Sequence, residues 1–207
     1  SFIRTDVARE EDVIAMLEHA VGRFGRLDIV FNNAGLAGAI GPVTETSVAD
    51  WDYTFDVLAK GVFLGIKHAA RIMREQKSGG SIINIGSIAG NNADHGMAVY
   101  NATKGAVHAL TRAIATDHGR DAIRCNAISP GWILTALADA AFDLAVDPAA
   151  ARAATERRHP AGRMGTPDDI AGLAVYLASS ESSFVSGSCY TIDGGLTAQS
   201  PISPDDL

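Results

Sequence analysis

Hydrophobic positions along the chain switch repeatedly between helical spacing and short continuous runs. Residues 9–24 place apolar side chains three and four positions apart, which predicts an amphipathic helix that ends at Gly25. Residues 27–33 form a nearly continuous apolar run, which is typical of a strand buried on both faces. The complete pattern predicts strands at residues 2–5, 27–33, 81–86, 122–128 and 188–192, and helices at residues 9–24, 51–75, 99–118 and 166–179.

This alternation of strands and helices determines the predicted fold class. Parallel strands need helical crossovers, so the pattern predicts an α/β fold with a Rossmann-like, doubly wound parallel sheet in three layers, α/β/α. We expect a single domain over residues 1–207, with a loosely held tail at residues 198–207. Ligands of such sheets bind beyond the carboxyl ends of the strands, where this chain carries Asp6, Asn32–Gly35, Ser87 and Pro130–Gly131.

Charge and composition narrow the function classes. The net charge is −7 and no long basic run occurs, which argues against nucleic-acid binding. No apolar run is long enough to span a bilayer, and we predict neither a membrane partner nor a metal site. Cys125 and Cys189 lie in apolar, strand-like segments, so we expect them to be reduced core residues of a cytoplasmic protein.

Tyr100 and Lys104 are the strongest candidates for chemistry. They stand four residues apart on a predicted helix and therefore share one face. A free phenol has a pKa of about 10, but a nearby ammonium favours the phenolate and lowers that pKa, so the pair suits acid/base catalysis. Ser87 leaves a predicted strand thirteen residues earlier and offers a hydroxyl to a substrate oxygen. The alternatives are a surface Tyr–Lys pair and a turn-forming serine.

Four motifs resemble those of one enzyme family. They are Tyr100-Asn101-Ala102-Thr103-Lys104, Ser87 after the run Ile-Ile-Asn-Ile-Gly, Asn32-Asn33-Ala34-Gly35, and Pro130-Gly131-Trp132-Ile133-Leu134-Thr135. In order and spacing, from residue 2 to about residue 196, they resemble the short-chain dehydrogenases/reductases. The resemblance implies an enzyme that transfers a hydride between NAD or NADP and a secondary alcohol or ketone.

The resemblance also implies roles for individual residues. Tyr100 would be the catalytic acid/base, Lys104 would lower its pKa and hold the nicotinamide ribose, and Ser87 would orient the substrate oxygen. Asn33 would have a structural role, its side chain tying neighbouring strands together. The implied cofactor-binding residues are Asp6 and Val7 at the adenine, Asn32, Ala34 and Gly35 at the adenosine, Ile133 and Thr135 at the carboxamide, and Pro130, Gly131, Tyr100 and Lys104.

Two features depart from the family pattern. The family often has a catalytic asparagine seven residues after a tryptophan, and counting from Trp51 places Leu58 there. We expect activity to be retained with this leucine, and the alternative is that Leu58 simply fills the core. The glycine-rich phosphate loop and the first two β-α units of the family would precede residue 2, so we expect this chain alone to bind pyrophosphate weakly. The residue that selects NAD or NADP belongs to that same region.

The resemblance further implies that residues 134–160 cover the substrate. This segment is rich in alanine and leucine, which predicts a helical flap and favours an apolar or cyclic alcohol over a sugar. The alternatives are a plain packing helix and, for His95, an ordinary loop histidine. The implied substrate contacts are Ser87, His95, Trp132 and Leu137.

The sequence also bears on the oligomeric state and leaves two alternative functions open. Apolar residues crowd the long helices at 51–75 and 99–118, so we expect a homo-oligomer, a tetramer. One alternative function is a cofactor-free lyase of the same fold, although its known relatives have arginine in place of Lys104. The other is a non-catalytic nucleotide-binding protein, for which Leu58 is the only hint.

Overall fold

A four-stranded parallel sheet organises the molecule, whose computed structural model describes residues 1–200. The strands lie in the order β1-β2-β3-β4 and all pairs are parallel. The strands are β1 (Ile29–Asn32), β2 (Gly80–Ile85), β3 (Ile123–Pro130) and β4 (Cys189–Ile192). The helices are α1 (Glu10–Phe24), α2 (Val48–Phe55), α3 (Gly61–Gln76), α4 (Ala98–His118), α5 (Ala136–Phe142), α6 (Pro148–Arg158) and α7 (Pro167–Ala178).

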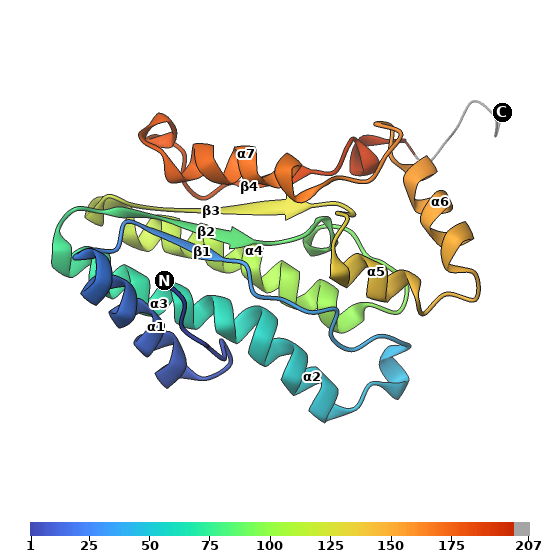
Figure 1. Ribbon diagram of the computed structural model, residues 1–207, viewed down its shortest axis with the longest axis horizontal. Helices are drawn as coiled ribbons and strands as arrows, with labels where there is room; N and C mark the ends of the chain where they lie inside the picture. Colours follow the sequence, from blue (N-terminus) through green and yellow to red (C-terminus); the bar gives the residue numbers. More distant parts are fainter. Residues whose placement is uncertain (201–207) are drawn as a thin grey trace.

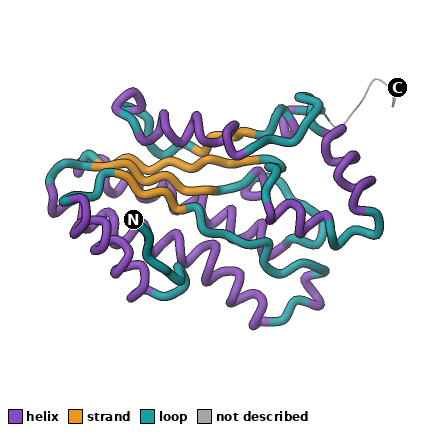
Figure 2. Tube along the Cα trace, viewed as in Figure 1, coloured by secondary structure: helices purple, strands orange, loops and turns teal. Residues whose placement is uncertain are grey.

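Helices cover both faces of this sheet. Figure 1 shows α1, α3 and α4 on one face, α7 on the other, and α5 and α6 beyond the carboxyl ends of the strands. Because neighbouring strand residues point to opposite faces, Ile82 packs into the core under α3 and α4, whereas Ile83 packs with Ile170 and Leu177 of α7. The three-layer α/β prediction is confirmed, and Figure 2 shows the same alternation of strand and helix along the chain.

The strand predicted at residues 2–5 does not form. These residues have no regular secondary structure, and they do not pair with β1, whose only strand neighbour within residues 1–200 is β2. A strand needs a neighbour for its backbone N–H and C=O groups, and sequence pattern alone does not supply one. Ile29 and Phe31 alternate with buried Val30, so their side chains lie on the opposite face of β1, where they are exposed.

The helix predicted at residues 51–75 is interrupted. It is divided into α2 and α3 by a π-helical turn at Asp56–Lys60, a wider turn that often occurs at functional sites. Leu58 lies in this turn and is only 1% exposed. Side chains cap two of the helices: Ser47 Oγ accepts from Asp50 N at 3.0 Å at the start of α2, and Asp169 accepts from Thr166 N at 2.7 Å at the start of α7.

Asn32, and not Asn33, ties neighbouring strands together. Asn32 Nδ2 donates to Asn84 Oδ1 of β2 at 2.8 Å, and Asn84 Nδ2 donates to Thr111 Oγ1 of α4 at 3.0 Å. Asn32 shares strand parity with buried Val30 and so faces the α3 side. The structural role that was predicted for Asn33 therefore belongs to the preceding residue, Asn32.

The segment at 134–160 contains two short helices, α5 and α6. Arg152 of α6 forms an ion pair with Asp139 of α5, and its guanidinium lies 5.1 Å from the centroid of the Phe142 ring. Phe142 in turn stacks on Trp132 at 5.2 Å. These contacts fix the two helices to each other and to the end of β3.

Several other predictions concern the chain ends and its composition. Of the predicted tail, residues 201–207 lie outside the described residues, whereas Gln199 Nε2 donates to the Arg158 carbonyl at 2.7 Å.

Both cysteines are free; Cys125 is buried and Cys189 is half-buried. Over residues 1–200 no helix has the length and apolar character needed to cross a membrane. Nor do those residues include a cluster of three or more His, Cys, Asp or Glu side chains placed to hold a metal ion.

The Asn32–Asn84 tie generates a stability prediction. A Cβ added at Gly65 of α3 would overlap Asn32 Oδ1, whereas a Cβ at Gly22 of α1 would meet nothing within 4 Å. Gly65→Ala should therefore displace Asn32 and lower the free energy of unfolding by about 1–3 kcal/mol. The matched control Gly22→Ala should raise it by about 1 kcal/mol or less through helix propensity. Urea unfolding measures both, and equal effects of the two changes would contradict the tie.

Candidate active site

A cavity of about 780 Å³ opens at the carboxyl ends of the strands. Its walls come from the residues after β1, β2 and β3, from the first turns of α4, from α5 and from one side of α7. This is the edge of the sheet at which a doubly wound fold binds its ligands. Ser87, Tyr100 and Lys104 all line it, so the fold brings together the three residues predicted to be catalytic.

Ser87 is held in place by its own backbone. It follows β2, adopts an extended conformation and begins the short 3-10 turn Ile88–Gly90. Its Oγ accepts from Ala89 N at 3.1 Å, and the residue is only 9% exposed. Accepting that bond leaves the hydroxyl proton available for donation to another oxygen.

Asn101 ties α4 to this turn. Its Nδ2 donates to the carbonyl of Ala89 at 2.8 Å and to that of Asn92 at 2.5 Å. The neighbouring residue on the helix is Tyr100. The bond to Ala89 therefore sets the position of the Tyr100 phenol relative to Ser87.

Lys104 lies one helical turn further on and is 5% exposed. Its Nζ donates to the carbonyl of Ile85 at 2.9 Å and lies 5.5 Å from the centroid of the Tyr100 ring. Burial lowers the pKa of Lys104 to about 8, because an ammonium is less stable away from water.

The pKa of Tyr100 is displaced in the direction opposite to the one expected. Burial raises the pKa of the phenol, hydrogen bonding with Ser87 lowers it in part, and the negative charge of Asp94 raises it further. Lys104 sits beside the ring and bonds to Ile85, so its charge does not offset the burial of the hydroxyl. Tyr100 is therefore protonated near neutral pH and is set up as a proton donor.

Most residues implied for cofactor and substrate line the cavity, but four do not. Those that line it are Ala34, Gly35, Pro130, Gly131, Trp132, Ile133, Thr135 and Leu137. Asp6 instead accepts from Ala8 N at 3.0 Å, Val7 packs beneath Gly61 of α3, and Asn32 bonds to Asn84. His95 is exposed and lies outside the cavity lining.

Sequence reasoning missed several residues of this region. Asn33 and Asp94 line the cavity, as do residues of α7. His108, for which the sequence indicated no role, is 2% exposed and shares a 2.8 Å hydrogen bond between its Nε2 and Ser129 Oγ. The only available signal for His108 was its position four residues after Lys104, on the same helix face.

The His108 ring fills the space beside two glycines. A Cβ at Gly86 would lie 2.6 Å from His108 Nε2, and a Cβ at Gly90 would overlap the other side of the ring. Burial lowers the pKa of His108, and the charges of Arg112 and Lys104 lower it further, so the ring is neutral. These two glycines flank the turn that holds Ser87.

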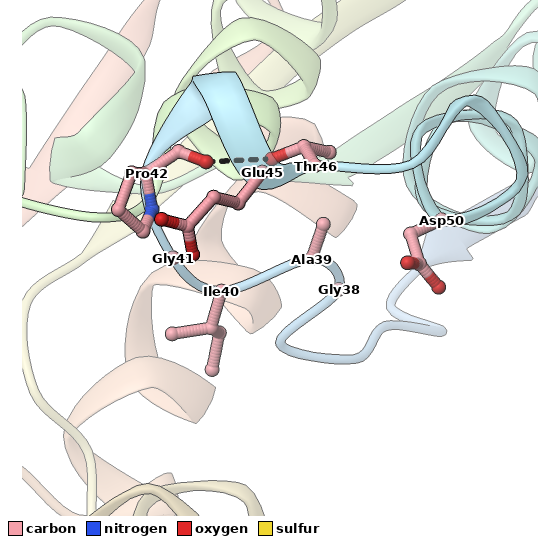
Figure 3. Close-up of a pocket in the computed structure, with 8 residues that line it drawn as sticks. All are labelled: Gly38, Ala39, Ile40, Gly41, Pro42, Glu45, Thr46 and Asp50. Atoms are coloured by element: carbon pink, nitrogen blue, oxygen red, sulfur yellow. Dashed lines mark hydrogen bonds between the residues drawn. The ribbon is translucent and has the colours of Figure 1, made fainter.

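A second, smaller pocket of about 330 Å³ lies outside this region (Figure 3). Figure 3 shows the loop from Gly38 to Thr46 beside the start of α2, with the Thr46 hydroxyl bonded to the Pro42 carbonyl at 3.3 Å. Of its two acidic residues, Glu45 and Asp50, Asp50 is already engaged by the Ser47 hydroxyl at 2.7 Å. None of the predicted catalytic residues lines it.

The large cavity fits a nicotinamide nucleotide. An ammonium has three N–H donors, and within the described residues Lys104 Nζ uses one of them, on Ile85. Two buried donors that face a cavity suit hydroxyl groups such as those of a ribose. The small residues Ala34 and Gly35 leave the neighbouring wall open to the close approach of a ligand.

Comparisons with known proteins agree with this geometry. A family model described as enoyl-(acyl carrier protein) reductase matches residues 1–197. The chain is 38% identical over 197 residues to the cis-4-hydroxycyclohexanecarboxylate dehydrogenase of Sinomonas cyclohexanicum, covering 95% of this chain and 76% of that protein.

Solved structures agree as well. A short-chain type dehydrogenase/reductase from Mycobacterium marinum is 36% identical with a TM-score of 0.87, covering 95% of this chain and 75% of that one. ElxO with NADP bound is 32% identical with a TM-score of 0.87, covering 96% of this chain and 79% of that one. The chain therefore belongs to the short-chain dehydrogenase/reductase family of NAD(P)-dependent oxidoreductases that act on CH–OH groups, as its motifs predicted.

Proposed function

We propose that Tyr100, Ser87 and Lys104 catalyse the reversible oxidation of a secondary alcohol of apolar or cyclic type to a ketone. The observation that carries this proposal is that the three side chains line one cavity, in which Ser87 is close enough to the Tyr100 phenol to lower its pKa in part. NAD(P) bound in this cavity would supply the hydride acceptor for oxidation of the alcohol and the hydride donor for reduction of the ketone. The protein must then supply the proton transfer at the substrate oxygen.

Each side chain has a separate task in this transfer. In ketone reduction the protonated Tyr100 phenol donates its proton to the carbonyl oxygen, and in alcohol oxidation the phenolate takes the hydroxyl proton. Ser87 donates a hydrogen bond to the same substrate oxygen and stabilises the charge that develops there. Lys104 offers its two remaining donors to the nicotinamide ribose, and we propose Ala34, Gly35, Pro130, Gly131, Ile133 and Thr135 as further cofactor contacts.

The cavity walls support an apolar substrate. Trp132, Leu137, Met97 and Ala141 line the part of the cavity next to α5, and Trp132 is stacked on Phe142. Leu58 contributes an apolar side chain to the cavity wall at the position where the family often has an asparagine. We propose that activity is retained, because the proton-transfer groups do not depend on the side chain at that position.

The two alternative functions receive less support. A cofactor-free lyase leaves the buried Lys104 without use for its spare donors, and a non-catalytic nucleotide-binding protein has no need of the Ser87–Tyr100 pair. Formation of NAD(P)H, followed by its absorbance with a panel of cyclic alcohols, tests the proposed function. Halide release without cofactor would favour the lyase, and binding of NAD(P) without turnover would favour the non-catalytic protein.

We also propose a homotetramer located in the cytoplasm. Trp51 of α2 and Phe63 of α3 are 40% and 44% exposed, which leaves apolar surface on helices outside the sheet core. Two free cysteines fit a reducing compartment. Sedimentation analysis would measure the assembly state.

Removal of the Tyr100 hydroxyl should abolish turnover. Tyr100→Phe keeps the ring but removes the group that transfers the proton, so kcat should fall at least about a thousandfold while the Kd for NAD(P) changes by less than about threefold. Tyr53→Phe removes a phenol hydroxyl from the exposed surface of α2 and should have no effect. Steady-state kinetics and calorimetric titration give the two readouts, and a Tyr100→Phe enzyme with ordinary kcat would refute the assignment.

Burial of Lys104 generates a pH-dependent stability prediction. Its pKa falls from the ordinary value of 10.5 to about 8 on folding, so between these pH values the unfolded chain binds more protons than the folded one. This group therefore makes the protein more stable as pH rises from 8 to 10.5, by up to about 3 kcal/mol. Lys104→Met should remove that rise and stabilise the protein at pH 7.

The matched control for this change is Lys77→Met, at an exposed position after α3. Unfolding free energies from urea titrations at several pH values between 7 and 10 should show the rise in the wild type and in Lys77→Met, but not in Lys104→Met. Parallel pH curves for all three proteins would show that Lys104 is not destabilised by burial.

A further inference from the structure

Asp94 places an unpaired negative charge on the wall of the catalytic cavity. It lies in the loop between the Ser87 turn and α4, where its carbonyl accepts from Met97 N at 3.2 Å. Both Asp94 and Met97 line the cavity. In the described part of the chain the Asp94 carboxylate has neither a hydrogen-bond partner nor an ion-pair partner.

The position of this charge matters because the rest of the wall is largely apolar. Among the described residues that line the cavity, Asp94 and Lys104 are the two charged side chains, and Lys104 uses one of its three donors on Ile85. Asp94 is exposed, whereas Lys104 is buried, so the charge of Asp94 lies toward the opening. The carboxylate is also close enough to raise the pKa of the Tyr100 phenol.

We propose that Asp94 selects secondary alcohols that carry a second hydroxyl group and disfavours those that carry a carboxylate. This inference rests on the proposed function, because it concerns the substrate that Tyr100 and Ser87 hold. A carboxylate only accepts hydrogen bonds, so a second hydroxyl of the substrate donates to it, whereas a substrate carboxylate is repelled. Hydrogen bonds to charged groups are strong enough to give a preference of about ten- to a hundredfold.

The geometry also explains why the hydroxyl must be a second one. The reacting oxygen is held by Ser87, which follows β2, and by the Tyr100 phenol, which lies in the first turn of α4. Asp94 belongs to the loop between those two elements and is a separate acceptor. A cyclic substrate that places one hydroxyl at Tyr100 can therefore donate a second hydroxyl to Asp94 while its ring stays against the apolar wall.

The experiment compares three kinds of substrate: cyclohexanol, the 1,2-, 1,3- and 1,4-cyclohexanediols, and 4-hydroxycyclohexanecarboxylate. The proteins are the wild type, Asp94→Asn, Asp94→Ala and Asp52→Asn, the last of which removes an exposed carboxylate of α2 outside the cavity. In the wild type we expect kcat/KM for at least one diol to exceed that for cyclohexanol about tenfold or more, with the carboxylate substrate the poorest.

The variants should change these ratios in different ways. Asp94→Ala should bring the diol-to-cyclohexanol ratio close to one, and Asp94→Asn should improve use of the carboxylate substrate about tenfold by removing the repulsion. Asp52→Asn should leave every ratio unchanged. Calorimetric Kd values measured in a Tyr100→Phe background, where turnover is absent, should show the same order of preference.

Failure of this inference is distinguishable from failure of the proposed function. Turnover with ratios that are equal in the wild type, Asp94→Ala and Asp52→Asn would overturn the role of Asp94 alone. Absence of NAD(P)H formation from every alcohol would overturn the proposed function and the inference that rests on it. A change of ratios confined to the Asp94 variants supports both.

Discussion

The attachment of α4 to the end of β2 is the interaction on which the site depends. Helical spacing puts Tyr100 and Lys104 on one face, but it does not aim that face at Ser87. Two bonds do so: Asn101 donates to the carbonyl of Ala89, and Lys104 donates to that of Ile85. These two carbonyls lie on either side of Ser87 in the chain. Helix α4 is therefore hydrogen-bonded to the backbone on both sides of Ser87, the residue that we propose acts together with the Tyr100 phenol.

This arrangement removes the Lys104 ammonium from water, which costs folding stability. Lys104 is almost completely buried, and this burial lowers its pKa to about 8; within the described residues its Nζ has one acceptor, the carbonyl of Ile85. The same burial raises the pKa of Tyr100 and keeps its proton in place. A site that holds an ammonium and a phenol away from water gains acid/base groups in defined states. Such sites commonly lower the stability of the surrounding fold.

The sequence predicted the architecture because it depends on local patterns, and the same patterns singled out Ser87, Tyr100 and Lys104, which line one cavity and which we propose as the catalytic residues. Apolar runs marked β1 to β4, and the four-residue spacing of Tyr100 and Lys104 placed both side chains on one face of a helix. The strand at 2–5 was wrong because pairing requires a neighbour, which periodicity does not reveal. The π-helical turn at Asp56–Lys60 was missed because a stripe of apolar residues continues across it.

Errors within the site have the same physical origin. Asn32 and Asn33 are adjacent, and a strand end uncertain by one residue exchanges the side chain that faces α3 with the one that faces the cavity. Asp94 and His108 have no motif of their own. They acquire importance only through tertiary packing, Asp94 against the cavity and His108 against the backbone at Gly86.

The imidazole of His108 has a consequence for how this protein can diverge. Its ring occupies the volume that any side chain at Gly86 or Gly90 requires, so the three positions form one steric unit. A larger residue is accepted at Gly86 only after the histidine has become smaller, whereas a Cβ at Gly90 would also lie 2.9 Å from the backbone carbonyl of Lys104. In descendants of this chain a change at position 86 should accordingly follow a change at position 108, whereas position 90 should stay glycine for as long as α4 keeps its distance from the Ser87 turn.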